Sequence, residues 1–234
     1  MKNLQTEIQS VVDIFKSGDL SKAEQLCKKL TDANPKVAFL YNLLGLILAE
    51  QKKIDQAIDC YEKGLKIDPD FAMIYNNLGL LFFKRKTSSA IKKAENYYMK
   101  SISLNKKIPE PHNNLGNLYG AQSKYKEAES CYKKAIYINS KFPYTYLNLG
   151  SLFVTLGKFN DAKKCFKEAI KLDSNMATAH KSLSRITKYT GDDEHFNELK
   201  NLYKNTNINN LENKINFGFA LGKAYEDINN YTNI

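Results

Sequence analysis

The sequence has few of the residues that interrupt helices. Its 234 residues include five prolines and eleven glycines, and tryptophan is missing. Proline and glycine are the residues least compatible with a helix interior, so their scarcity favours a mostly helical chain. Hydrophobic residues make up 43% and charged residues 26% of the chain, which is ordinary for a globular protein and too apolar for an intrinsically disordered one.

Long apolar segments are missing as well. The longest apolar run, Leu43 to Ala49, is far shorter than the roughly 18 residues of a membrane-spanning helix. The amino-terminal segment lacks the continuous apolar core and small-residue cleavage site of a secretory signal. The four cysteines are too far apart for a small disulfide framework, and no C-x-x-C pair suggests zinc. We therefore expect a soluble cytoplasmic protein with reduced thiols.

Arginine is rare although the chain is basic. Lys and Arg total 35 against 25 Asp and Glu, a net charge of +10, and Arg85 and Arg185 are the only arginines. The positive sign suits nucleic acid, but arginine is the side chain that most often reads bases. Many lysines fall as neighbouring pairs in the expected second helices, where a solvated outer face explains them. We expect no nucleic-acid partner.

What the sequence does contain is an internal repeat. Segments beginning at Tyr41, His112 and Tyr146 superimpose residue on residue: YNLLGLILAEQKKIDQAIDCYEKGLKIDP, HNNLGNLYGAQSKYKEAESCYKKAIYIN and YLNLGSLFVTLGKFNDAKKCFKEAIKLD. Each has a Leu-Gly pair in its first half, then an alanine followed four residues later by an aromatic residue. The pairs are Leu44-Gly45, Leu78-Gly79, Leu115-Gly116 and Leu149-Gly150, then Ala57 with Tyr61, Ala94 with Tyr98, Ala128 with Tyr132 and Ala162 with Phe166. Such a period indicates stacked helix pairs that share one core.

This pattern resembles the tetratricopeptide repeat, whose unit has about 34 residues. The resemblance implies an all-α, right-handed superhelical solenoid of antiparallel helix pairs, forming a single domain over residues 1–234. The expected units are 4–37, 38–71, 72–108, 109–142, 143–176, 177–205 and an incomplete unit at 211–234. The third unit is three residues longer, and we expect the extra residues between its helices at Lys84–Ser89. That basic loop is either a contact site or an incidental insertion.

In proteins of this family, the first helices line a concave groove that binds a peptide. Asn77, Asn114 and Asn148 share the sixth repeat position there, and Asn113 and Asn117 extend the polar patch. Amides both donate and accept hydrogen bonds, so an exposed ladder could hold an extended peptide by its backbone. The ladder resembles that of the repeats of O-linked N-acetylglucosamine transferase. The alternative is that these asparagines are merely solvated.

Two further features could contact a peptide in the groove. Tyr144 is either an exposed anchor for a ligand side chain or a packing residue against the preceding unit. Lys181, Arg185 and Lys188 are spaced to form one helical stripe, which could attract an acidic peptide or a carboxylate. The carboxylate clamp of chaperone-binding relatives is reproduced here only in part, so a plain solvated stripe is the alternative.

No arrangement typical of catalysis is recognisable. His112 and His180 occupy a position held elsewhere by tyrosine, and His195 belongs to a different helix, so we do not expect the histidines to form a metal or catalytic set. The cysteines occupy near-equivalent repeat positions and should be spread along the stack. We expect no enzymatic activity, no cofactor and no metal.

The sequence therefore favours a non-catalytic scaffold that binds a protein or peptide. The alternative is the substrate-recruiting region of a larger enzyme, a sulfotransferase or a glycosyltransferase. The segments ITKYTGDDEHFNELKNLYKN and FALGKAYEDI resemble the junction in bacterial proteins that join these repeats to a sulfotransferase domain. Residues 211–234 restart the first-helix pattern with Leu221, Gly222 and Tyr225, which suggests either a longer chain or self-association through this helix.

Overall fold

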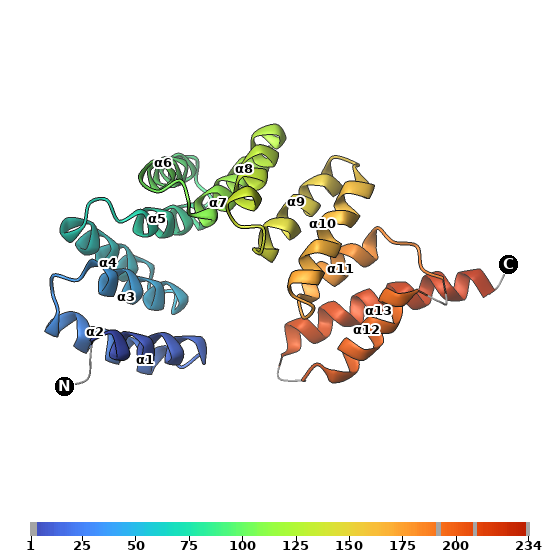
Figure 1. Ribbon diagram of the computed structural model, residues 1–234, viewed down its shortest axis with the longest axis horizontal. Helices are drawn as coiled ribbons and strands as arrows, with labels where there is room; N and C mark the ends of the chain where they lie inside the picture. The colour runs from blue at the N-terminus through green and yellow to red at the C-terminus, as the bar shows by residue number, and fades with distance from the viewer. Residues whose placement is uncertain (1–3, 191–192, 208–209, 233–234) are drawn as a thin grey trace. The chain divides into compact units, whose positions relative to one another are not determined.

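The structure, a computed structural model, describes residues 4–190, 193–207 and 210–232, with side chains described to residue 229. These residues form thirteen α-helices and no strand (Figure 1). The prediction of an all-α, tetratricopeptide-like stack of helix pairs is confirmed. Within the described ranges, no helix is both long enough and apolar enough to cross a membrane. The helices are α1 Leu4–Lys16, α2 Leu20–Ala33, α3 Ala38–Glu50, α4 Ile54–Ile67, α5 Ala72–Lys84, α6 Ser88–Leu104, α7 Pro109–Ala121, α8 Tyr125–Ile138, α9 Pro143–Thr155, α10 Phe159–Leu172, α11 Ala177–Arg185, α12 Glu194–Asn205 and α13 Leu211–Thr232.

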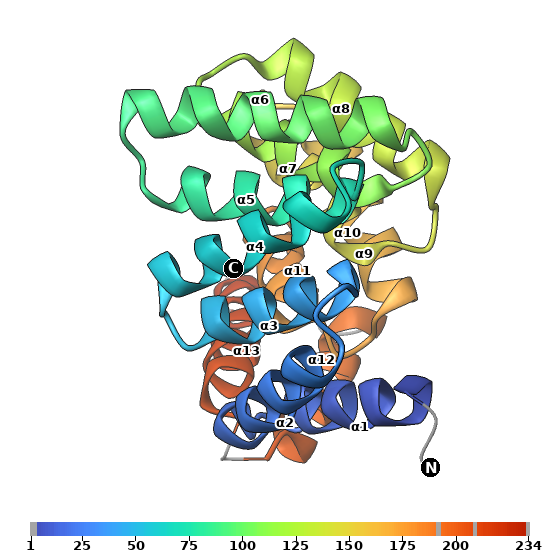
Figure 2. The same cartoon turned by 90° about the vertical axis from the view of Figure 1, so that its left-hand side faces the viewer.

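The chain divides into two compact units, unit 1 (residues 1–118) and unit 2 (residues 119–234). In unit 1, helices α1 to α6 follow one another in sequence order, each packed on the next (Figure 2), and α7 is joined to α5 through a hydrogen bond from Asn114 to Asn76. In unit 2, α8, α9, α10 and α11 are likewise each packed on the next. Consecutive packing is the arrangement that repeats require, because a single helix pair cannot bury its own apolar face.

The repeated glycines allow close helix packing in both units. A Cβ atom added to Gly79 of α5 would lie 2.6 Å from the Tyr98 ring of α6. A Cβ atom on Gly150 of α9 would lie 2.6 Å from the Phe166 ring of α10. Such distances are too short for any side chain, so the aromatic ring of each second helix packs directly on the backbone of the first.

The longer third repeat differs from the prediction. The structure places the extra residues in α6, which has 17 residues where α4, α8 and α10 have 14 each. The Thr87 side chain caps this helix by accepting a hydrogen bond from the backbone N–H of Ala90 at 3.3 Å. The expected loop at Lys84–Ser89 is therefore short, and its Arg85 pairs with Asp55 of α4 at 3.3 Å and lies over the Phe82 ring.

The carboxyl-terminal helices of unit 2 depart from the repeat. The first helix α11 has only nine residues, and the 22-residue α13 packs on both α11 and α12 (Figure 1). On α13 the buried apolar residues are Phe217, Ala220 and Ala224, which join the core of Phe196 and Leu199, and Asn216 beside them is buried as well.

The repeat pattern expected over Leu221, Gly222 and Tyr225 is used only in part: Leu221 packs at the edge of this core and the Tyr225 ring meets that of Phe196 edge-on at 5.1 Å, whereas Gly222 takes part in no close helix contact. Leu221 is half-buried, and Gly222 and Tyr225 are exposed. A Cβ atom on Gly222 would meet nothing within 4 Å, unlike those on the earlier repeat glycines. The physical reason is that a different face of α13 is buried. On this face Phe217, Ala220 and Ala224 pack against α11 and α12.

Candidate functional site

An unbroken chain of asparagine side chains links three first helices of unit 1. The Nδ2 of Asn77 on α5 donates to Oδ1 of Asn42 on α3 at 2.9 Å. The Nδ2 of Asn114 on α7 donates to Oδ1 of Asn76 on α5 at 3.0 Å. Within each pair of neighbours, Asn76 donates to Asn77 at 3.3 Å and Asn113 donates to Asn114 at 3.5 Å. All the donors point the same way along this amide chain, so each bond can polarise the next.

The amide chain changes the role expected of the asparagines. Asn77 is only 6% exposed and uses its amide to accept from Asn76 and to donate to Asn42. Asn77 therefore does not belong to an exposed ladder. Its amide joins α5 to α3 by a hydrogen bond to Asn42. Asn114 and Asn117 are half-buried on α7, and Asn113 is buried.

Two members of the amide chain were not among the predicted site residues. Asn42 and Asn76 stand one position before the sixth, and Asn113 holds the same place in the next repeat. The signal was present in the doubled asparagines of YNNLG and HNNLG. In YNNLG, the second asparagine, Asn77, was predicted as a site residue, but Asn76, which donates to Asn77 and accepts from Asn114, was not.

The predicted residues of α9 lie in unit 2. Tyr144 is 56% exposed, with its ring centroid 6.1 Å from that of Phe142. Asn148 is half-buried one turn later, so the two residues share a helix face. Phe39 of α3 in unit 1 occupies the repeat position of Tyr144 and is also exposed. Each unit thus offers an exposed aromatic side chain at the start of a first helix.

The predicted cationic stripe is not continuous. Helix α11 ends at Arg185, so Lys188 lies in the connection after it. The Nζ of Lys181 donates to Oδ1 of Asn216 on α13 at 3.0 Å and lies 4.9 Å from the centroid of the Phe219 ring. Lys181 therefore fastens α13 to α11. The stripe prediction is wrong because the helix is shorter than the repeat pattern suggested.

Arg185 and Lys188 do come together at another place. Both line a surface pocket of about 440 Å³, which Lys163 and Lys223 also border. Lys223 forms an ion pair with Asp227, which offsets part of the positive charge. Asp227 in turn accepts a hydrogen bond from the backbone N–H of Tyr189 at 3.2 Å. This pocket is a second, cationic candidate for ligand contact.

A chain of polar side chains runs through the junction of α11 and α12. His180 Nε2 donates to the carbonyl of Ser174 at 3.0 Å, which leaves Nδ1 as an acceptor 2.9 Å from His195 Nε2. His195 Nδ1 lies 2.7 Å from the Tyr189 hydroxyl, which lies 2.7 Å from the hydroxyl of Ser184. A single direction of donation, from Ser184 through Tyr189 and the histidines to Ser174, satisfies every one of these atoms.

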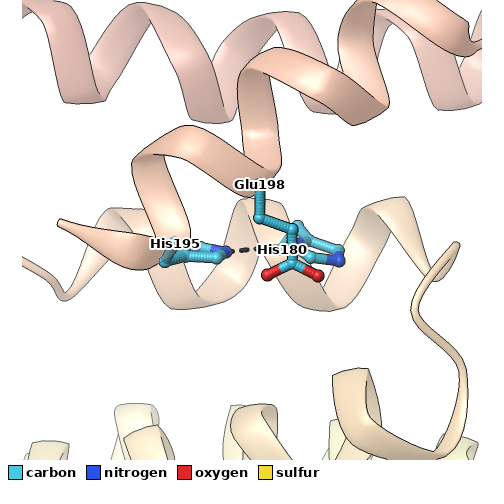
Figure 3. Close-up of side chains that lie close together, drawn as sticks. All are labelled: His180, His195 and Glu198. Carbon is cyan, nitrogen blue, oxygen red and sulfur yellow. Dashed lines mark hydrogen bonds between the residues drawn. The ribbon is translucent and has the colours of Figure 1, made fainter.

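His180 and His195 come into contact although, as expected, they belong to different helices. The connection after α11 brings α12 back over α11, so the two rings meet with their planes nearly parallel, at an angle of 13°. Glu198 lies on the next turn of α12, and its carboxylate is close to the two imidazole rings (Figure 3). No sequence pattern signals this contact, because His180 and His195 occupy unrelated repeat positions.

The environment keeps both imidazoles neutral near pH 7. Burial lowers the pKa of His195 to about 4, and the neighbouring His180 and Lys167 contribute to the same shift. Burial also lowers the pKa of His180, although the Glu198 carboxylate opposes that shift. Beside His195 and Glu198, a pocket of about 1010 Å³ opens between α10 and α12, with Lys167 on its opposite wall.

Comparisons with known proteins agree with the repeat pattern. Residues 45–85 match the family described as TPR repeat, and residues 109–142 and 143–176 each match the tetratricopeptide repeat. No curated protein sequence matches the chain. The repeat prediction is confirmed, whereas the resemblances to O-linked N-acetylglucosamine transferase and to sulfotransferase proteins stay predictions.

Solved structures share the fold at low sequence identity. PilF of Pseudomonas aeruginosa is 16% identical, over 98% of this chain and 95% of that one, with a TM-score of 0.68. PilW, a type IV pilus biogenesis factor, is 19% identical over 92% of this chain and 97% of that one, with a TM-score of 0.69. A TPR protein of Thermus thermophilus is 14% identical over 79% of this chain and 98% of that one, with a TM-score of 0.70.

Proposed function

We propose that this tetratricopeptide repeat protein is a non-catalytic scaffold that binds a peptide or protein segment across its first helices. Tetratricopeptide repeats are typical protein-binding modules, and the chain carries several of them. The observation that carries the finer proposal is the amide chain of unit 1. It reaches α7 at the half-buried Asn114 and the buried Asn113, with Asn117 one turn further along the same helix.

The amide chain supports peptide binding in two ways. Hydrogen bonds between successive first helices hold them in register, so a ligand meets a preorganised surface. An Asn amide has two donor hydrogens and two acceptor lone pairs, and Asn114 therefore keeps bonding capacity after donating to Asn76 and accepting from Asn113. In the same unit, the exposed Phe39 provides an apolar contact of the kind that dominates interfaces, and Tyr144 does the same within unit 2.

A displayed library of random peptides tests the proposal. We expect the full chain to enrich peptides that bind to it, and the Asn114→Ala variant to lose about tenfold in affinity for them. Asn96→Ala is the matched control, because Asn96 is an exposed asparagine on the second helix α6. Failure to enrich any peptide, or equal affinity of the Asn114→Ala variant, would overturn the proposal.

The second candidate is the same binding role within a larger enzyme. It is favoured by the resemblance of residues 186–205 and 219–228 to the junction of bacterial repeat–sulfotransferase proteins. Much of these two segments forms α12 and α13, which share one buried core with α11. An antibody against this chain would decide the matter. A native polypeptide near 26.7 kDa favours the scaffold, and a much larger one favours the recruiting region.

A further inference from the structure

Three side chains with metal-ligand chemistry converge where α12 lies over α11. One ligand atom from each of His180, His195 and Glu198 lies within 4.8 Å of the other two. His180 is fully buried, whereas His195 and Glu198 are half-buried at the edge of the pocket of about 1010 Å³. The two rings and the carboxylate therefore lie close together (Figure 3), and His195 and Glu198 form the side of the cluster that borders the pocket.

The outer hydrogen bonds aim one nitrogen of each imidazole at the other ring. His180 Nε2 is held by the Ser174 carbonyl, so the lone pair of Nδ1 points to His195. His195 Nδ1 is held by the Tyr189 hydroxyl, so Nε2 points back to His180. Histidines that bind metals commonly have the second nitrogen bonded to a carbonyl or another polar group, which fixes the ring.

The Glu198 carboxylate supplies the third group. Among residues 4–190, 193–207 and 210–229, no hydrogen bond or ion pair engages it. It lies close enough to His180 to influence the pKa of that imidazole. A carboxylate placed against two imidazoles without a hydrogen-bond partner of its own is ready to accept a cation.

We propose that His180, His195 and Glu198 bind a divalent transition-metal cation, with Zn²⁺ as the best match to two nitrogen ligands and one oxygen ligand. Zn²⁺ binds imidazole nitrogen at about 2.0–2.1 Å and prefers tetrahedral sites, which require nitrogens about 3.3 Å apart. The observed separation of 2.9 Å needs to open by only a few tenths of an ångström. A water molecule from the pocket completes the coordination.

Metal binding also requires a rearrangement of protons, and the polar chain permits it. In the hydrogen-bonded state His195 carries its proton on Nε2, where the metal must bind. The proton takes the Nδ1 position instead and is donated to the Tyr189 hydroxyl, which then donates to Ser184. The links from Ser184 to His195 reverse their direction without gaining or losing a proton, and the His180–Ser174 bond is kept, so the bound metal would join α11 to α12.

Calorimetric titration of the EDTA-treated full chain with Zn²⁺ tests the site, and Co²⁺ absorption in the visible range reports its geometry. We expect one Zn²⁺ per chain and the absorption of a tetrahedral Co²⁺ complex. Glu198→Gln should weaken binding by about tenfold or more, and His195→Gln should weaken it further. Glu194→Gln is the matched control, since Glu194 lines the same pocket one turn earlier on α12.

Two results would overturn the proposal. The first is no stoichiometric binding of Zn²⁺ to the wild-type chain. The second is full affinity in Glu198→Gln, which should fold normally because no hydrogen bond of the carboxylate is lost. Helicity and thermal unfolding in EDTA show whether His195→Gln is folded. If it is unfolded, the Glu198→Gln result alone decides, because Glu194→Gln controls for the loss of one negative charge.

Discussion

The polar networks of unit 1 and unit 2 are built from the same kind of helix pair but follow different rules. In unit 1 the amide chain joins asparagines of neighbouring repeat positions, so its links recur between α3, α5 and α7. In unit 2 the His180–Ser174 bond corresponds to the bonds that Tyr41 and Tyr75 donate to the carbonyls of Pro35 and Pro69. The links from His180 through His195 and Tyr189 to Ser184 depend instead on helix α12 and the connection before it. A periodic sequence yields periodic contacts, whereas the shortened α11 creates a local site that occurs once.

The largest effect is expected from removing a core ring in each unit, which compares how much the repeat packing contributes to the stability of unit 1 and of unit 2. Tyr61→Ala in unit 1 and Phe166→Ala in unit 2 each remove a ring that is 1% exposed and packs on a repeat glycine. Each should lower the free energy of unfolding by about 3–5 kcal/mol in urea denaturation. Tyr137→Ala, at a side chain that is 92% exposed, should change it by less than about 0.5 kcal/mol. A small loss for Phe166→Ala alone would mean that α13, rather than the repeat packing, stabilises unit 2.

The two polar networks can be broken one at a time. Asn77→Ala leaves the Asn42 carbonyl and the Asn76 amide without their partners, and Tyr189→Phe does the same to His195 and Ser184. Each should cost about 1–3 kcal/mol of unfolding free energy, because buried polar groups lose their hydrogen bonds. Thermal unfolding of both variants checks this, with Asn96→Ala as the control. If Asn77→Ala is neutral, the amide chain does not hold the first helices together.

Each unit contains a glutamate that pairs with two lysines, and the two triads should differ in how much stability is lost at acidic pH. In unit 1 Glu24 pairs with Lys28 at 2.5 Å and with Lys53 at 2.8 Å. In unit 2 Glu129 pairs with Lys133 at 2.6 Å but lies 3.8 Å from Lys158, and its side chain is 23% exposed against 11% for Glu24. The tighter, more buried triad of unit 1 should contribute more to stability.

The hydrogen bonds from Lys28 and Lys53 lower the pKa of Glu24 from 4.5 to about 2. Its contribution to stability is therefore complete above pH 4.5 and is lost as the pH falls towards 2. Because both lysines are substantially exposed, we expect about 1–2 kcal/mol. Urea denaturation at neutral pH and at about pH 3 should show a smaller acid loss in Glu24→Gln than in wild type. An unchanged acid loss in this variant would contradict the assignment, and Glu129→Gln provides the unit 2 comparison.

The smallest effect concerns equivalent rings of the two units. The Tyr98 hydroxyl is buried without a hydrogen-bond partner among the described residues, and of the two corresponding residues in unit 2, Tyr132 and Phe166, the second has no hydroxyl. Tyr98→Phe removes the orphaned hydroxyl and should leave stability unchanged or raise it by up to about 1 kcal/mol. Differential scanning calorimetry measures the shift. A clear destabilisation would show that this hydroxyl has a partner in solution.

Much of the fold could be predicted from the sequence because the repeat is steric. The Leu-Gly pairs and the alanine–aromatic pairs fix which helix faces meet, and the structure places the Tyr61, Tyr98 and Phe166 rings on the expected glycines. The candidate site was only partly predictable. Asn114, Asn117 and Tyr144 lie on first helices, but Asn77 is buried and Lys188 lies outside its helix.

The sequence alone determined that this chain is an all-helical, tetratricopeptide-like stack of helix pairs, since close packing at glycine and alanine depends on residues a few positions apart within each unit. The tertiary structure decided which polar groups meet. The amide chain requires helices that lie side by side, and the His180–His195 contact requires α12 to fold back over the shortened α11. A hydrogen bond forms only within about 3.5 Å, and sequence periodicity does not encode distance between residues that do not repeat.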